Sequence, residues 1–160
     1  MLRAKLGISP IAWWNDDDVN LSDDVSLEEA LRQASVAGFV GMETGQRFPM
    51  NMQELGPILD KYNIQVCGGW FSGDLLTGDI EREKERIEQQ LQFFKAADAP
   101  CIVYGEVSGS VQSRRDKALS QNQSLMKKKW HSMAAKFQIL PNIVKNRVCR
   151  FPIITIWARW

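Results

Sequence analysis

The sequence predicts an α/β protein whose core is a parallel β-sheet, and three observations carry that prediction. Short apolar runs of strand length alternate with longer amphipathic segments of helix length as far as Tyr104. The connections between them are short, and strands joined through helices in this way lie parallel with right-handed crossovers. The chain has 160 residues, 44% of them hydrophobic, which is enough for one well-buried core. We therefore expect about four β/α units followed by an atypical tail.

The first unit begins with a strand at residues 5–8. Ser26 and Glu29 form a Ser-x-x-Glu capping pattern, in which the serine hydroxyl accepts from an early helix N–H and the glutamate reaches back. The helix is expected to end at Gly38, because glycine tolerates the left-handed conformation at a helix end. A second strand follows at residues 39–43.

The same unit then repeats along the chain. Helices are expected at residues 51–62 and 79–97, and strands at residues 65–69 and 101–104. The longer helix has one apolar face, and acids near its start suit the positive end of the helix dipole. The apolar face comprises Ile80, Ile87, Leu91 and Phe94, and the acids are Glu81, Glu83 and Glu85.

The charge pattern changes abruptly after Asp116. All nineteen Asp and Glu residues lie at or before it, whereas residues 117–160 carry nine Lys and Arg and no acid. The chain therefore divides into residues 1–121 and a basic, acid-free tail of residues 122–160. Residues 127–137 could be helical, and residues 151–157 resemble a strand. A solvated arm is the usual interpretation, but aromatic residues are unusual in a disordered arm. They are Trp130, Phe137, Phe151, Trp157 and Trp160.

Polar and aromatic side chains follow each predicted strand, at the end where parallel β/α folds gather their reactive groups. Rings that cover C–H faces, together with acids and amides that bind hydroxyls, suit a polyhydroxylated ligand. Glu43 could instead cap a neighbouring loop, Glu106 could be a solvated loop acid, and the tryptophans could be packing residues. In chain order the candidates are Trp13, Trp14, Asn15 and Asp16, then Glu43, then Trp70, then Glu106.

No motif for a metal site is present. A catalytic divalent metal needs several converging His, Asp or Glu ligands, but the single histidine, His131, is expected to be an exposed bystander. Cys67, Cys101 and Cys149 are widely spaced, which favours free thiols in a reducing cytoplasm. No apolar run approaches the roughly 20 residues that span a bilayer. We expect a cytoplasmic protein without a signal peptide or membrane segment.

Four blocks of sequence carry a resemblance to a known family. They are residues 7–16 (GISPIAWWND), 41–45 (GMETG), 69–73 (GWFSG) and 104–112 (YGEVSGSVQ). In order and spacing they resemble the first half of the inosose (2-keto-myo-inositol) dehydratases, which are xylose-isomerase-like barrels, and the likeness runs from residue 5 to residue 121. The resemblance implies an incomplete (β/α)8 TIM barrel, because a whole barrel needs about 250 residues.

The resemblance also implies a function. It is the elimination of water from 2-keto-myo-inositol to give a trihydroxycyclohexane dione in myo-inositol breakdown, with manganese or cobalt as cofactor. The metal ligands and the catalytic base are expected on later strands and cannot be carried over, so this chain should be inactive alone. Asn15, Glu43, Trp70 and Glu106 are the expected substrate-pocket residues. A sugar isomerase or epimerase on the same barrel is the alternative. A non-enzymatic protein whose basic tail binds nucleic acid is the alternative of another class.

The tail invites a hypothesis about its reading frame. In the family the corresponding stretch is acid-rich and leads to a Tyr-His-His-His-Met-Gly-Thr-Val-like strand. Codons allowed for residues 151–160 permit that run when they are read from the third base, so we hypothesise a frameshift between about Ser120 and Ser124. A half barrel would also leave its fourth strand as an exposed edge, which predicts self-association unless the tail covers that edge.

Overall fold

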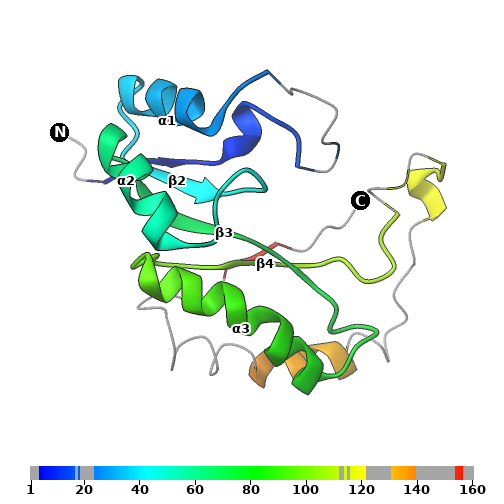
Figure 1. Ribbon diagram of the computed structural model, residues 1–160. Helices are drawn as coiled ribbons and strands as arrows, with labels where there is room; N and C mark the ends of the chain where they lie inside the picture. The colour runs from blue at the N-terminus through cyan, green and yellow to red at the C-terminus, as the bar shows by residue number, and fades with distance from the viewer. Residues whose placement is uncertain are drawn as a thin grey trace.

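The computed structural model describes residues 4–16, 18, 24–111, 114, 116–121, 131–139 and 154–156, with backbone alone at residue 119 and at 154–156. Within these residues five parallel strands form one curved sheet in the order β1-β2-β3-β4-β5. Figure 1 shows the helices arranged around the outer side of the curl. The predicted α/β class and the incomplete barrel are confirmed.

The elements follow the predicted order. The strands are β1 (Gly7–Ile8), β2 (Gly41–Thr44), β3 (Gln65–Gly73), β4 (Val103–Glu106) and β5 (Ile154–Ile156). The helices are α1 (Leu27–Val36), α2 (Met52–Tyr62) and α3 (Ile80–Ala96), with short 3-10 helices η1 (Pro10–Ala12) and η2 (Leu119–Gln121). A further helix spans residues 131–139. No helix in the described part of the chain is both long and apolar enough to cross a bilayer.

The helix ends follow from local chemistry. Ser26 Oγ accepts from Glu29 N at 3.2 Å, as predicted, and Gly38 adopts a φ of 89° just past the end of α1. The Glu29 carboxylate bonds forward to Arg32 and Gln33 on the next turn, where a bond back to the cap was predicted. The side chains of Asn51 and Asp79 cap α2 and α3.

A β-bulge divides β3 into two parts. β2 pairs with β3 first as Met42↔Val66 and then as Glu43↔Gly68, so one extra residue lies in β3 between the two pairs. Gly68 has a φ of 149°, and a Cβ there would lie 3.0 Å from Cys101 Sγ. Both its backbone and its surroundings therefore require glycine.

Part of the predicted tail packs onto the sheet and α3. In helix 131–139, which lies beside α3 in Figure 1, Met133 is buried and the Phe137 ring lies 5.3 Å from the Tyr104 ring, edge to face. Lys136 Nζ donates to the carbonyl oxygens of Leu75 at 2.9 Å and Gly78 at 2.6 Å. These contacts join the helix to the core beside β4.

The edge of β4 is paired. β5 runs parallel to it, with Val103 opposite Ile154 and Gly105 opposite Ile156. The sequence predicts self-association unless the tail covers the edge of β4. Here β5, which belongs to the tail, covers that edge. Other features predicted for the tail lie outside the described residues; they are Trp130, Cys149, Phe151, Trp157, Trp160 and the basic run 127–129.

Candidate functional site

Glu43 lies at the carboxyl end of β2 with a half-buried carboxylate. Its strand neighbours Met42 and Thr44 are buried, so alternation along the strand places Glu43 on the opposite, inner face. Among the described residues its carboxylate makes no hydrogen bond or ion pair. Burial, followed by the negative charge of Glu43, raises the pKa of the Cys67 thiol to about 11 and also raises that of Cys101.

Trp70 lies on β3 beyond the bulge, and its side chain is 44% exposed. A Cβ on Gly105 of β4 would overlap the indole ring, so the ring lies across the backbone of the neighbouring strand. The indole Nε1 donates to Ser72 Oγ at 2.9 Å. Phe71, the next residue, is buried on the other face, where the Arg86 guanidinium of α3 lies 5.4 Å from its ring. Trp70 therefore offers an accessible aromatic surface on the inner face.

Asn15 follows β1 and η1 in an exposed loop. Its Oδ1 accepts from Asp18 N at 2.9 Å, which closes a local turn of the kind that asparagine favours. Its neighbour Trp13 donates from Nε1 to Gln33 Oε1 of α1 at 2.8 Å. Both side chains thus have roles in holding this loop.

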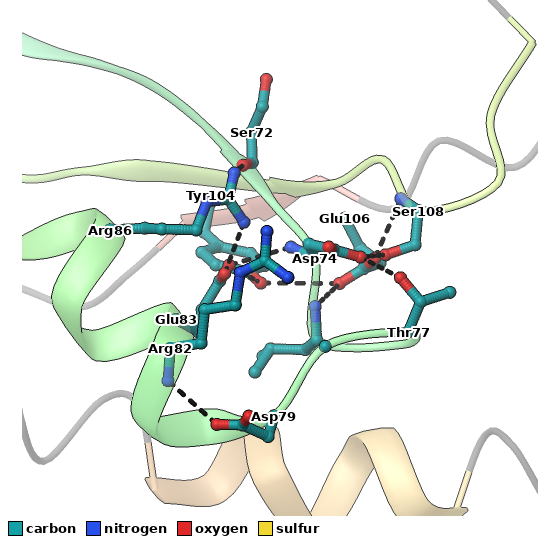
Figure 2. Close-up of polar contacts among 12 residues, drawn as sticks. Ser72, Asp74, Thr77, Asp79, Arg82, Glu83, Arg86, Tyr104, Glu106 and Ser108 are labelled. Carbon is teal, nitrogen blue, oxygen red and sulfur yellow. Dashed lines mark hydrogen bonds and ion pairs between the residues drawn. The ribbon is translucent and has the colours of Figure 1, made fainter.

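Glu106 lies at the end of β4 but bonds away from Glu43 and Trp70. Its Oε2 accepts from Leu75 N at 2.9 Å and its Oε1 from Ser108 N at 3.0 Å. Figure 2 shows this carboxylate directed at the loop that follows β3. Two backbone N–H groups therefore occupy its two oxygens, and the structure brings Glu43 and Trp70, but not Glu106, to the inner face.

Glu83 is the polar residue that sequence reasoning missed. It is 1% exposed, and its carboxylate accepts from Asp74 N at 2.9 Å, the Tyr104 hydroxyl at 2.7 Å and Arg86 at 2.6 Å. Burial, and then the adjacent Glu83, raise the pKa of Tyr104. A signal was available, since residues 80, 83, 87, 91 and 94 share one helical face on which Glu83 is the only acid.

Asp74, Glu83 and Glu106 form a carboxylate cluster around residues 74–79, shown in Figure 2. Asp74 accepts from the hydroxyls of Ser108, at 2.5 Å, and Thr77, and these bonds lower its pKa. N–H and O–H donors thus already fill the cluster. The part of the chain that the structure describes contains no group of three or more His, Cys, Asp or Glu side chains that could hold a metal ion.

A cavity of about 320 Å³ opens at the other end of the sheet. It is lined by residues at the starts of the strands, including Lys5, Val40, Gln65 and Pro100. Reactive groups in parallel β/α proteins gather at the carboxyl ends of the strands. We therefore place the candidate site at the inner face near Glu43 and Trp70, away from this cavity.

A curled parallel sheet with helices on its outer side and polar groups at its carboxyl edge defines the class of this protein as a β/α half-barrel. Comparison with known proteins narrows the class. The chain is 33% identical over 138 residues to an inosose dehydratase of Mesomycoplasma hyopneumoniae, which covers 86% of this chain and 43% of that relative. It is 34% identical over 144 residues to one of Bacillus anthracis, covering 89% of this chain and 48% of the relative.

An inosose dehydratase of Serratia proteamaculans is 29% identical over 145 residues, with 91% of this chain and 49% of the relative covered. No family model matches the chain. The resemblance to the inosose dehydratases is confirmed, and the chain spans about half the length of the relatives that it matches. The matched share is larger than residues 5–121 could supply, so the match includes part of the chain after Gln121. The domain boundary at residue 121 stays a prediction.

Proposed function

We propose that this chain forms half of a lyase that eliminates water from 2-keto-myo-inositol. The observation that carries the proposal is the likeness to curated dehydratases along most of the chain. The site supports it, because a carboxylate without a partner among the described residues and an accessible indole lie on one face of the sheet at its carboxyl edge. Such a pairing suits a ring bearing several hydroxyls.

Elimination next to a ketone needs a base to take the α-proton and an acid to assist departure of hydroxide. From this chain, Glu43 would bind a substrate hydroxyl and Trp70 would cover a C–H face of the ring. Glu106 and Glu83 would hold the loop after β3 in place. Asn15 would shape the loop after β1 and stays a candidate substrate contact. The base itself is expected from the other half of the barrel.

A divalent metal, manganese or cobalt, is expected in the family, but the donor set here does not fit one. The described residues offer no converging trio of ligands, and the carboxylates that do converge accept from backbone, hydroxyl and guanidinium donors. No step is therefore assigned to a metal held by this chain. We propose that the ligands, like the base, are supplied by the other half.

The direct test is dehydration of 2-keto-myo-inositol with added manganese, followed by the ultraviolet absorbance of the dione product. This chain alone should show no turnover, whereas a fusion of residues 1–139 to the remaining half of the Bacillus anthracis relative should be active. Glu43→Gln in the fusion should raise KM, while Glu54→Gln on the exposed side of α2 should leave it unchanged. A folded fusion that leaves the substrate untouched would contradict the proposal.

Two alternative functions predict different experimental outcomes from the proposed dehydratase. A sugar isomerase or epimerase on the same barrel would interconvert ketose substrates in the fusion without forming the dione. A nucleic-acid-binding tail would give salt-dependent binding that disappears on truncation after Gln121. We expect neither, and we propose a cytoplasmic protein that acts on a small polyol ketone.

The hypothesised frameshift is tested by resequencing the locus.

A further inference from the structure

Two buried polar atoms lack hydrogen-bond partners in the loop that follows β1. They are the indole Nε1 of Trp14 and Oδ1 of Asp16, two residues further on, and no described residue bonds to either. Buried polar groups in native proteins are nearly always satisfied, so each such exception requires an explanation. One of these atoms is a donor and the other an acceptor.

Both side chains are held against the segment that follows β2. The Trp14 side chain is 3% exposed; Arg47 lies 5.1 Å from its ring centroid and the Phe48 ring 6.5 Å away. Asp16 Oδ2 lies 2.9 Å from the position that a Cβ on Gly45 would occupy, and the Asp16 carbonyl accepts from Gln46. The unsatisfied atoms therefore belong to one loop pair at the carboxyl edge of the sheet.

The adjacent Trp13 gives an internal comparison. Its indole N–H is satisfied by Gln33 of α1 at 2.8 Å, whereas the Trp14 N–H, one residue later, has no partner in the described chain. Arg47 lies over the Trp14 ring, and the buried Nε1 of that ring is a donor that no described group uses. The difference between the two tryptophans lies in this unused donor.

We propose that Trp14 Nε1 and Asp16 Oδ1 form a hydroxyl-binding subsite for a polyhydroxylated ring. One ligand hydroxyl accepts from the indole, and a second hydroxyl donates to the carboxylate. An alcohol group suits both atoms, because it is at once a donor and an acceptor. The choice of a polyol ring as the ligand rests on the proposed function; the unsatisfied pair itself does not.

Indole N–H resonances of the whole chain, titrated with myo-inositol, test the proposal. The Trp14 signal should shift with saturation while the Trp13 signal stays in place. Trp14→Phe, which keeps a ring beside Arg47, and the isosteric Asp16→Asn should each weaken binding about tenfold, since hydrogen bonds to charged groups contribute most. Trp13→Phe is the matched control and should bind as the parent does.

Circular dichroism establishes that each variant is folded. An unmoved Trp14 signal, or dissociation constants equal to the parent's in both variants, would overturn the proposal. The two proposals can fail separately. Polyol binding that depends on Trp14 and Asp16, with no dehydration by the fusion, leaves the subsite standing. If the fusion dehydrates the substrate and neither variant changes its KM, the subsite proposal fails while the proposed function stands.

Discussion

The Tyr104 hydroxyl donates a 2.7 Å hydrogen bond to Glu83 Oε1, which ties the end of β4 to the first turns of α3. The same carboxylate oxygen accepts from Asp74 N, the first residue after β3. One buried glutamate therefore joins two strands and a helix at the edge of the sheet where the candidate site lies. Its position makes it the main polar anchor of the loop after β3.

Glu83→Gln is expected to lower the free energy of unfolding by about 2–4 kcal/mol. The amide removes the charge that Arg86 pairs with and can turn a donor towards the Tyr104 hydroxyl and Asp74 N, leaving buried groups unsatisfied. Urea denaturation measures the change. Glu81→Gln, on a side chain that is 73% exposed, should stay within about 0.5 kcal/mol. Equal effects of the two variants would show that Glu83 contributes no more than a surface acid.

Met133→Ala is expected to destabilise the protein by about 2–4 kcal/mol, because a side chain only 1% exposed would leave a cavity. Ser132→Ala, at an exposed neighbouring position, should have no measurable effect. Thermal or urea unfolding of the two variants provides the comparison. If Met133→Ala proves neutral, helix 131–139 does not belong to the folded core in solution.

Truncation tests the boundary at residue 121 directly. A chain ending at Ile139 should unfold cooperatively, whereas one ending at Gln121 should lose Phe137 from the Tyr104 ring and the two Lys136 bonds to the loop after β3. Hydrogen exchange should show the loss as weaker protection in residues 74–79. Identical protection in both chains would mean that the helix adds nothing to the fold.

Gly105→Ala is expected to displace the Trp70 indole and to destabilise the protein by about 1–3 kcal/mol through overpacking. The displaced ring should change the tryptophan fluorescence spectrum. Gly56→Ala, in α2, is the matched control, because its Cβ would meet only the end of Met52 at 4.0 Å. That substitution should stabilise the helix by about 0.5–1 kcal/mol.

Cys67 should react slowly with a thiol reagent at pH 8 and faster as the pH approaches 11, where its thiol ionises. The folded pKa lies above the unfolded value of about 8.5. The folded state therefore keeps a proton that the unfolded state loses between these values, and the free energy of unfolding falls across that window. Glu43→Gln should lower the pKa of Cys67 and speed labelling, whereas Glu54→Gln should not. Unchanged labelling in Glu43→Gln would place the two groups further apart than the structure does.

The order of strands and helices could be predicted because it follows from local patterns. Ser26, Asn51 and Gly38 act within a few residues of their own positions, and the apolar periodicity of α3 is visible in the sequence. The place of Glu43 near the carboxyl end of its strand also followed from the end of a short apolar run. These features need no knowledge of distant contacts.

The bonding of Glu106 could not be predicted, because it depends on the backbone N–H of Leu75, 31 residues earlier in the chain. The bulge at Gly68 arises from pairing between β2 and β3, which no local window contains. The unsatisfied atoms of Trp14 and Asp16 depend equally on how two loops meet. Contacts between distant parts of the chain therefore decide which side chains hold loops and which remain available to a ligand, and local sequence patterns do not reveal those contacts.

The bulge in β3 makes the aromatic lining of the site depend on a residue count. Cys67 is the extra residue, and without it the strand would alternate regularly and still present Trp70 on the inner face. Loss of one residue between Val66 and Trp70 would therefore remove the bulge and keep the aromatic lining. Insertion of one more residue would instead exchange the faces beyond it: Phe71 would face the open side, and Trp70, with its polar N–H, would be pressed into the apolar layer beneath α3.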